Sequence, residues 1–371
     1  MRVLHVYKDY PPVIGGIEKH IKSLAEGESG RGLDVTVLAT NIGPRTVVER
    51  IDRLAVIRAG RLCRIASTPV SISFFWWMSR LSADITHLHF PNPPGELGHL
   101  AVGKGRKLVI TYHSDIVRQR RALRLYGPTL RRVLKKADRI IATSPAYVDS
   151  SPFLSDCAEK CEVIPLGIDL SWMDRVDRAR VEAIRSCHRG PLALFVGRLR
   201  YYKGLQYLLE AYAQVPGTLL VIGSGPMRRQ WEKFAAGCGI SERVLFLGDV
   251  PDASLPAYYH ACDVFVLPAS HRSEAFGLVQ VEAMAAGRPV VSTDLGTGTS
   301  FVNAHQETGL VVEPRNPDAL AQAINQLLGD EPLRRRLGTA GRQRVEREFA
   351  ADIMVERTID LYGRVLKTGG A

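Results

Sequence analysis

Short apolar runs alternate with amphipathic or turn-bounded segments along this chain, and the alternation occurs twice. This pattern is typical of parallel strands joined by helices, because a parallel connection needs a long crossover. In the first half we predict strands at residues 3–7, 34–39, 55–58, 85–89, 108–113, 139–143 and 162–166. In the second half we predict strands at 192–197, 219–222, 244–247, 264–267, 289–291 and 309–312. The expected fold is α/β, with two Rossmann-like domains facing across a cleft.

Between residues 168 and 190 the β pattern is lost and the sequence becomes charged, which favours a domain boundary. We predict an N-terminal domain over 1–170, a linker over 171–190 and a C-terminal domain over 191–350. The last segment, 351–371, contains an amphipathic helix that we expect to pack back on the N-terminal domain. A ligand site is expected in the cleft between the domains.

The bulk composition narrows the class of partner. The net charge of +11 predicts an anionic partner: a nucleotide, a nucleic acid or an anionic lipid. No apolar run reaches the roughly 18–20 residues of a membrane span, and the N-terminus lacks a secretory signal pattern, so we expect a cytoplasmic location. Of six scattered cysteines only Cys157 and Cys161 are close, and with no neighbouring histidine they make a poor zinc site.

The segment from Ser270 to Gly287 carries the strongest chemical signal. It follows a predicted buried strand, and it places Glu274 just before an apolar helix that carries a second acid, Glu282. A buried carboxylate needs a partner, and ligand hydroxyls can supply one. The intervening backbone N–H groups of Phe276, Gly277 and Leu278 lie at a helix N-terminus, which suits a phosphate. We expect Glu282 about two turns along the helix; the alternative is a buried helix with one salt-bridged glutamate.

Two further motifs follow predicted strands. Gly15-Gly16 opens a helix after the first strand, where glycines let a ligand approach the backbone; a plain tight turn is the alternative. Arg198 and Lys203 follow the first strand of the second half, and both can reach one diphosphate; a solvated basic loop is the alternative. Neither a dinucleotide glycine motif nor a P-loop is present.

His113 ends a predicted strand and could bond a sugar hydroxyl or polarise a reaction centre, although a structural role is the commoner one for such a residue. No Asp-x-Asp occurs in the chain, so the charge of a leaving diphosphate must be met by Arg198, Lys203 and helix N-termini. We therefore expect no metal or other cofactor.

Two segments are candidates for a membrane surface. Residues 117–136 hold eight Arg/Lys and no acid, with Gly127-Pro128 expected to interrupt the helix. Ser73–Met78 contains two tryptophans, which favour the membrane–water interface. We expect contact with an anionic membrane through Arg118 to Lys136; the alternative for this segment is a solvated face, and for Ser73–Met78 a buried helix face. A nucleic-acid role for the basic segment lacks interleaved stacking aromatics.

With these motifs together, the chain resembles the GT-B retaining glycosyltransferases of family four over essentially its whole length. The resemblance is carried by residues 15–18, 197–198, 203–204, 223–226 and 274–287. Residues 297–303 and 308–312 are similar to a subgroup often assigned as mannosyltransferases of surface polysaccharide or lipid-linked glycans. The segment His271-Arg272-Ser273 before the first acid departs from the commoner pattern.

The resemblance implies a role for each motif residue. The N-terminal domain is the acceptor side and the C-terminal domain binds the nucleotide sugar. Glu274 holds donor-sugar hydroxyls, Glu282 the ribose, and Arg198 and Lys203 the diphosphate. The resemblance also implies that the N–H groups of Phe276, Gly277 and Leu278 bind the diphosphate. Gly15 and Gly16 would line the phosphate and acceptor side. His113 would contact the sugar, and the backbone near Val250 would contact the base.

The leading hypothesis is a retaining, metal-independent hexosyltransferase that uses a nucleotide diphosphate sugar, with GDP-mannose as the expected donor. Its acceptor would be lipid-linked or a polysaccharide, reached at the inner face of the membrane. The alternatives are a nucleotide-sugar epimerase, a soluble-acceptor glycosyltransferase with a UDP-sugar, or a basic membrane-surface or nucleic-acid binding protein with a degenerate cleft. No nucleic-acid partner is expected under the leading hypothesis.

Overall fold

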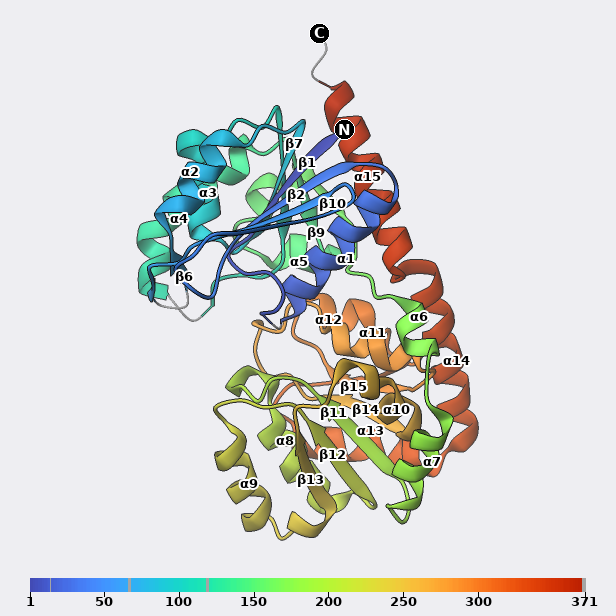
Figure 1. Cartoon of the computed structure of the whole chain (residues 1–371). Coiled ribbons are helices and arrows are strands. Elements are labelled where there is room, and N and C mark those ends of the chain that lie inside the picture. The colour runs from blue at the N-terminus through green and yellow to red at the C-terminus, as the bar shows by residue number, and fades with distance from the viewer. Residues whose placement is uncertain (14, 66–67, 118–119, 369–371) are drawn as a thin grey trace. The chain divides into compact units, whose positions relative to one another are not determined.

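The structure is a computed structural model that describes residues 1–13, 15–65, 68–117 and 120–368, with residues 120–122 described by their backbone alone. The chain forms two compact units. Unit 1 comprises Met1–Gly167 with the C-terminal residues from Ala351, and unit 2 comprises Ile168–Ala350. Each unit has its own sheet and its own covering helices (Figure 1).

Unit 1 is built on an eight-stranded sheet with the order β10-β9-β8-β7-β1-β2-β4-β3. All neighbours are parallel except β3, which pairs antiparallel with β4. The strands are β1 (Arg2–Val6), β2 (Asp34–Thr40), β3 (Val47–Ile51), β4 (Leu54–Ala59), β7 (Ile85–Phe90), β8 (Lys107–Tyr112), β9 (Arg139–Ala142) and β10 (Cys161–Val163). β5 (Cys63–Ile65) and β6 (Thr68–Val70) form a separate antiparallel pair.

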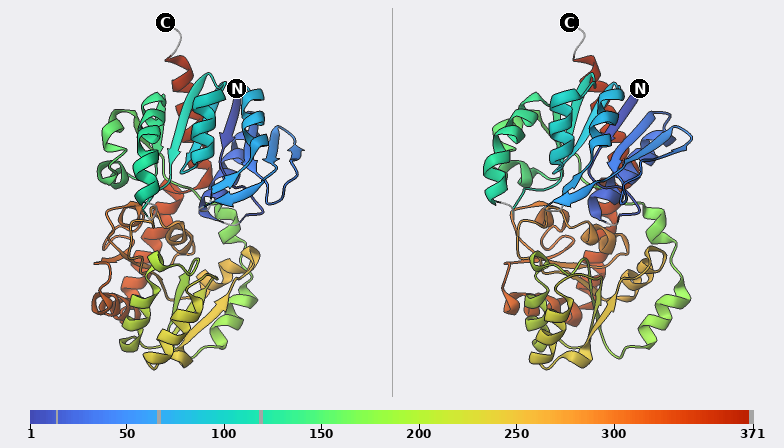
Figure 2. Two further views of the ribbon diagram at one scale, coloured as in Figure 1. Left: turned by 90° about the vertical axis from the view of Figure 1, so that its left-hand side faces the viewer. Right: turned by 60° about the vertical axis from the view of Figure 1, so that its left-hand side comes forward.

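The helices of unit 1 include the last one in the chain. They are α1 (Gly16–Gly30), α2 (Ile72–Arg80), α3 (Pro93–Val102), α4 (Arg120–Lys136), α5 (Pro145–Ser150), the 3₁₀ helix η1 (Ser155–Lys160) and α15 (Ala351–Lys367). Because its apolar residues recur at helical spacing, α15 buries Met354, Leu361 and Val365 in the same core as Ile21 of α1. Figure 2 shows α15, in red, alongside the strands of this unit.

Unit 2 is built on a six-stranded, wholly parallel sheet with the order β13-β12-β11-β14-β15-β16. The strands are β11 (Leu192–Val196), β12 (Thr218–Ile222), β13 (Val244–Gly248), β14 (Val264–Leu267), β15 (Val290–Thr293) and β16 (Gly309–Val312). β11, β14 and β15 are buried along their whole length, as expected for parallel strands covered on both faces.

The helices of unit 2 cover this sheet. The α-helices are α6 (Leu170–Asp174), α7 (Arg178–Ser186), α8 (Leu205–Ala211), α9 (Arg228–Gly237), α10 (Leu255–Ala261), α11 (Leu278–Ala285), α12 (Gly298–Val302), α13 (Pro317–Gly329) and α14 (Glu331–Glu348). The 3₁₀ helices are η2 (Tyr201–Lys203), η3 (Tyr212–Gln214), η4 (Ser241–Arg243) and η5 (Asp252–Ser254). The predicted α/β class with two parallel sheets is confirmed.

Two local expectations differ from the structure. Residues 171–190, expected to be a linker, contain helical residues of unit 2, and α7 packs on α10. Arg185 of α7 forms a bidentate ion pair with Asp263, with both N–O distances at 2.8 Å. The segment reads as a linker because α7 is rich in charged residues and none of its residues is fully buried.

The second difference concerns α4, which continues through Pro128 instead of breaking there. Proline removes one helical N–H, but the following turns are held by Leu130, Val133 and Leu134, which are buried. Within the residues described, no helix is both long and apolar enough to span a bilayer.

Candidate active site

The order of strands in unit 2 identifies where a ligand can enter. β11 lies between β12 and β14, so the chain leaves the carboxyl ends of β11 and β14 in opposite directions. In an open parallel sheet this switch point leaves a crevice beyond the strand ends, where ligands bind. Lys203 follows β11 and Glu274 follows β14. Two of the residues selected from the sequence therefore lie at this position.

Lys203 and Glu274 form an ion pair, with 2.7 Å between Nζ and Oε2. Both residues are buried, at 7% and 8% exposure. Burial acts to lower the pKa of Lys203, but Glu274, Tyr202 and Glu282 together outweigh it, so the pKa is raised and the ammonium stays charged. A buried charged pair of this kind is costly unless further polar groups complete its hydrogen bonding. The pair therefore offers one fixed cation and one fixed anion to a ligand at the switch point.

The loops that carry the pair approach each other so closely that a side chain is excluded. Gly204 adopts φ +67°, and a Cβ there would lie 2.0 Å from the carbonyl oxygen of Pro268. Gly204 N-caps α8 immediately after Lys203, and Pro268 follows β14. Glycine at this position thus brings the two strand ends into contact, and with them Lys203 and Glu274.

The loop after Glu274 leads into an uncapped helix N-terminus. Gly277 is the N-cap of α11 with φ +76°, and no side chain caps the helix. Thr297 Oγ1 donates to the carbonyl of Glu274 at 2.9 Å, and the Gly298 N–H donates to the carbonyl of Ala275 at 2.7 Å. Phe276 is buried and Leu278 is the first helical residue. The first-turn N–H groups are thus held in place and available to an anion.

Glu282 lies in the second turn of α11, not two full turns in, because the residues between Glu274 and Gly277 are not helical. It is 7% exposed, and its Oε2 accepts a hydrogen bond of 2.6 Å from the Tyr259 hydroxyl. Burial and the Glu282 charge raise the pKa of Tyr259 well above its usual value. Glu282 also helps to raise the pKa of Lys203, so the two acids and the lysine form one electrostatic group.

Arg198 and Val250 lie at the same edge of the sheet, on its surface. Arg198 follows β11 directly and is exposed, with no ion pair among the described residues. Val250 follows β13 and is half-buried. The Ser224 hydroxyl donates to Asp249 at 2.6 Å, which joins the loops after β12 and β13. The structure thus leaves the Arg198 guanidinium free to bind an anion in solvent.

The remaining predicted residues belong to unit 1. Gly15 is the N-cap of α1, where a Cβ would collide with the Glu18 carboxylate, and a Cβ on Gly16 would meet open space. His113 follows β8 and is 4% exposed. Its ring lies 5.0 Å from that of His20 in α1, measured between centroids. His113 therefore contacts the helix that Gly15 and Gly16 open.

Several residues around these positions were not selected from the sequence. Tyr259, which supports Glu282, carries no local signal because it acts on a residue more than twenty positions away. Thr297 lies in a segment noted only for its resemblance, and its hydrogen bond to Glu274 could not be read from the sequence. The sequence also did not predict the cluster of buried histidines in unit 1, His5, His87 and His89. Its one sequence signal is the alternation His87-x-His89 within a strand, which places both rings on one face of the sheet.

Chemically, unit 2 can bind a ligand that carries both negative charge and hydroxyl groups. Lys203, Arg198 and the N-terminus of α11 suit phosphate oxygens. Glu274 and Glu282 are acceptors that suit hydroxyl donors. A diphosphate flanked by two hydroxyl-bearing rings meets both requirements, and group transfer from such a ligand is the chemistry that the site can serve.

Comparison with known families gives the class to which this fold and site belong. The family model Glycosyltransferase Family 4 matches residues 14–172, and Glycosyl transferases group 1 matches residues 181–344. The chain belongs to the GT-B glycosyltransferases of family four.

Its relatives include the O-antigen chain mannosyltransferase C of Escherichia coli, which is 37% identical over 99% of this chain and 100% of its own length. The D-rhamnosyltransferase of Pseudomonas aeruginosa is 38% identical over 95% of this chain and 93% of its own length. Among solved structures, sucrose-phosphate synthase from Thermosynechococcus elongatus superposes with a TM-score of 0.81 at 24% identity, covering 99% of this chain and 100% of that one. The protein is thus a hexosyltransferase by homology, and its fold is that of GT-B enzymes.

Proposed function

We propose that this protein transfers mannose from GDP-mannose, with retention of anomeric configuration, to a lipid-linked or polysaccharide acceptor. The observation that carries the site assignment is the buried pair of Lys203 and Glu274 at the switch point of the sheet in unit 2. The choice of sugar is supported by the mannosyltransferase relative, and the choice of base by mycobacterial relatives described as GDP-mannose-dependent mannosyltransferases.

The proposed donor contacts divide the ligand among fixed groups. Lys203 and Arg198 bind the diphosphate, together with the N–H groups of Phe276, Gly277 and Leu278. Glu274 accepts hydrogen bonds from the sugar hydroxyls and Glu282 from the ribose. The base lies by the backbone at Val250. In unit 1, Gly15 and Gly16 line the phosphate and acceptor side, and His113 contacts the sugar.

In the proposed reaction, the bond between the sugar C1 and the diphosphate oxygen breaks while a bond from C1 to the acceptor oxygen forms on the same face. The proton of the acceptor hydroxyl passes to the leaving diphosphate oxygen, which balances the step without a protein nucleophile. Lys203 and Arg198 stabilise the charge that develops on the leaving group, and this needs no metal ion. The protein otherwise acts by orientation.

The test is transfer by the full-length protein from GDP-mannose and, separately, from UDP-glucose to a lipid-linked acceptor, with the product anomer read by NMR. Transfer of mannose in the α configuration from the α-linked donor supports the proposal. An inverted product would refute retention, and transfer from UDP-glucose alone would refute the donor. Consumption of the donor to an epimer without acceptor would identify an epimerase instead.

We further propose that unit 1 meets its acceptor at an anionic membrane surface. Ile72, Phe75 and Trp76 of α2 are 73%, 39% and 50% exposed, and Leu97 of α3, which packs on α2, is 46% exposed. Exposed apolar side chains of this size are typical of binding surfaces, and tryptophan favours the membrane interface. The predicted basic contact from Arg118 to Lys136 lies partly outside the described residues; within α4, Arg124, Arg131 and Lys135 are exposed.

Sedimentation with vesicles tests this surface. Binding to vesicles that contain phosphatidylglycerol, and its loss in Phe75→Ser/Trp76→Ser with transfer to a soluble acceptor retained, would support a lipid-facing role. Equal binding of the variant and the wild-type protein would refute it.

A further inference from the structure

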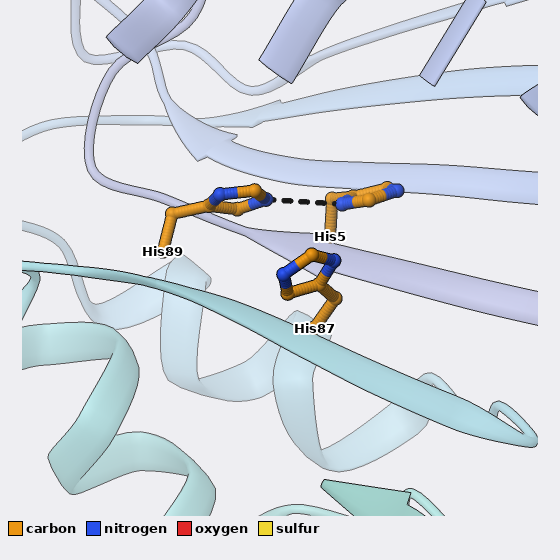
Figure 3. A group of neighbouring side chains, drawn as sticks. All are labelled: His5, His87 and His89. Atoms are coloured by element: carbon orange, nitrogen blue, oxygen red, sulfur yellow. Dashed lines mark hydrogen bonds between the residues drawn. The ribbon is translucent and has the colours of Figure 1, made fainter. Parts of the chain in front are cut away.

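Four buried side chains of unit 1 form one continuous series of hydrogen bonds, which we name the histidine wire: Glu28, His5, His89 and His113. Glu28 Oε2 lies 2.7 Å from His5 Nε2. His5 Nδ1 lies 3.0 Å from His89 Nε2, the hydrogen bond drawn in Figure 3. His89 Nδ1 in turn lies 3.2 Å from His113 Nε2. The first three residues are fully buried and His113 is 4% exposed. The wire therefore runs from a carboxylate in α1 to the histidine at the end of β8.

The sheet explains why these rings meet. β1, β7 and β8 are adjacent and parallel, and His5 is directly opposite His87 in the register. Side chains two residues apart point to the same face, so His89 lies beside this pair on the face of His5. His89 is opposite Thr111, and His113 follows two residues later. Three neighbouring strands thus direct their histidines to one layer, where α1 supplies Glu28.

A neutral imidazole has one donor nitrogen and one acceptor nitrogen, whereas a carboxylate only accepts. Burial lowers the pKa of His89 and of His113 well below the usual value, so both rings are neutral near pH 7. Because a carboxylate only accepts, His5 Nε2 is the donor to Glu28, and an imidazole with its single proton on Nε2 accepts at Nδ1. His89 must then donate from Nε2 to His5 Nδ1 and accept at its own Nδ1, so His113 donates from Nε2 to His89 Nδ1. One carboxylate thereby determines the tautomer of a ring three hydrogen bonds away.

The far end of the wire has an unused acceptor. His113 Nδ1 is buried and has no hydrogen-bond partner among the described residues. In the Nε2–H tautomer this atom carries a lone pair, so it can accept a hydrogen bond from a hydroxyl group. In the other tautomer it would present an N–H, which a hydroxyl proton could not approach.

We propose that Glu28, acting through His5 and His89, holds His113 in the Nε2–H tautomer so that its Nδ1 accepts a hydrogen bond from a sugar hydroxyl. Glu28, His5 and His89 are then positioning residues, since none of them contacts the substrate in this arrangement. The proposal rests on the proposed function in one respect, the placement of the sugar beside His113. The tautomer itself does not depend on it.

A side branch provides a matched control. The Tyr362 hydroxyl lies 3.1 Å from Glu28 Oε1 and 2.6 Å from His87 Nδ1, and His87 Nε2 lies 2.6 Å from Thr111 Oγ1. This branch is equally buried and starts at the same carboxylate, but it ends at Thr111 instead of His113. Thr111→Val removes a hydrogen bond of the branch with little change of shape and leaves the wire intact.

Metal binding is the competing explanation for so many buried imidazoles. Two sets have ligand atoms close enough to share an ion: His5, His87 and His89, and His20, His89 and His113. Both ring nitrogens of His89 are used in the wire, so an ion in either set would displace a hydrogen bond. The hydrogen-bonded arrangement and the metal-bound one therefore exclude each other, and an experiment can separate them.

The deciding experiment records the long-range ¹H–¹⁵N spectrum of full-length protein labelled at histidine, near pH 7, which shows the protonated nitrogen of each ring. Wild-type His89 and His113 are expected as neutral Nε2–H tautomers. His5→Phe, which keeps a ring in place but removes the link to Glu28, is expected to leave His113 as a mixture. Thr111→Val is expected to leave it unchanged.

An Nδ1–H tautomer of His113 in the wild-type protein, or a His113 signal that is the same in His5→Phe, would overturn the proposal. Zn²⁺ binding to the wild-type protein that disappears in His89→Phe would also overturn it. The wild-type spectrum shows the tautomer of His113 directly, so it tests the proposal even where a variant does not fold.

Activity supplies a second readout. Loss of one hydrogen bond to the substrate corresponds to roughly a 3- to 10-fold fall in rate. We expect that fall in the kcat of His5→Phe, with no such fall in Thr111→Val. Absence of transfer in the wild-type protein would refute the proposed function and leave the tautomer result standing, so the two failures are distinguishable.

Discussion

The ammonium of Lys203 lies 2.7 Å from a carboxylate oxygen of Glu274, although the two residues belong to loops that follow different strands. Each charge is buried and each is the counter-ion of the other, so removing one leaves the other without compensation. A ligand with a phosphate and a hydroxyl can engage both at once. The pair therefore has a part in stability as well as in the proposed reaction, and the two effects can be separated.

Lys203→Ala is expected to lower kcat by roughly 10²–10³-fold, since a fixed electrostatic donor contributes about 2.7–4 kcal/mol to a transition state. Breaking a buried ion pair is also expected to destabilise unit 2 by about 3–5 kcal/mol. The double variant Lys203→Met/Glu274→Gln removes both charges and should recover most of the stability but none of the activity. Urea unfolding and transfer assays on both proteins check this; activity near the wild-type level in either would disprove the site assignment.

Glu282→Gln is expected to weaken nucleotide binding, because hydrogen bonds from hydroxyls to a charged acceptor contribute about 1.5–3 kcal/mol, or roughly 10- to 150-fold in Kd. The amide can still accept from Tyr259, so the fold should be kept. Calorimetry with GDP measures the change. Glu346→Gln, in an exposed pair with Arg342, is the control and should bind GDP normally. Equal Kd values for Glu282→Gln and the control would contradict a ribose contact.

Gly204→Ala is expected to disrupt the crevice, because its positive φ is strained for alanine and the new Cβ would meet the Pro268 carbonyl at 2.0 Å. We expect lower stability of unit 2 together with loss of GDP binding. Gly16→Ala, whose Cβ meets nothing within 4 Å, should fold normally and lose activity only if a ligand approaches there. Thermal melts and transfer rates for the two variants test this contrast; a fully stable, active Gly204→Ala protein would rule out the packing argument.

Acid is expected to destabilise unit 1. Burial lowers the pKa of His20 to about 3, and burial also lowers the pKa of His87, His89 and His113 well below the usual value. Between the folded value and about 6.5 the unfolded chain binds the extra proton, so stability falls as the pH falls, by about 1.4 kcal/mol per pH unit for each ring.

Glu96 changes the stability with pH in the opposite direction, because burial raises its pKa to about 8. Above about 4.3 the unfolded carboxyl loses a proton that the folded one keeps until pH 8, so this group lowers stability as the pH rises. Below pH 6.5 the change of stability with pH is governed by the four histidine rings, and from pH 6.5 to about 8 it is governed by Glu96. Stability should therefore be highest near pH 6.5.

Urea unfolding of Trp172→Phe/Trp231→Phe, whose remaining tryptophans both lie in α2 of unit 1, measures this profile by fluorescence. Glu96→Gln should remove the decline on the alkaline side and keep the one on the acid side. A profile flat between pH 4 and 6.5 would contradict neutral burial of the histidines.

Chelation is expected to leave transfer unchanged. The chain has no Asp-x-Asp, and Lys203 and Arg198 provide the charge that a bridging metal would otherwise supply in the proposed reaction. Initial rates with and without EDTA, after dialysis against chelator, measure this. Activity lost on chelation and recovered with Mg²⁺ or Mn²⁺ would show that the cations of the protein are insufficient.

Much of the fold was accessible from the sequence, because a parallel strand buried on both faces must be a short apolar run and its crossover must be helical. The strands of both sheets follow from that pattern, with the exception of the exposed β3 and the short pair of β5 and β6, whose residues show no continuous apolar run. α7 was missed for the same reason, since it buries no residue.

The sequence by itself determined which residue types the candidate site offers, since Glu274, Glu282, Arg198 and Lys203 stand in recognisable motifs next to strand ends. Only the tertiary structure decided which of them meet. The pairing of Lys203 with Glu274 depends on β11 lying beside β14, and the histidine wire depends on β1, β7 and β8 being neighbours. The physical reason is that periodicity is a local property of the chain, whereas strand order is set by the packing of all the elements together and joins residues far apart in the sequence.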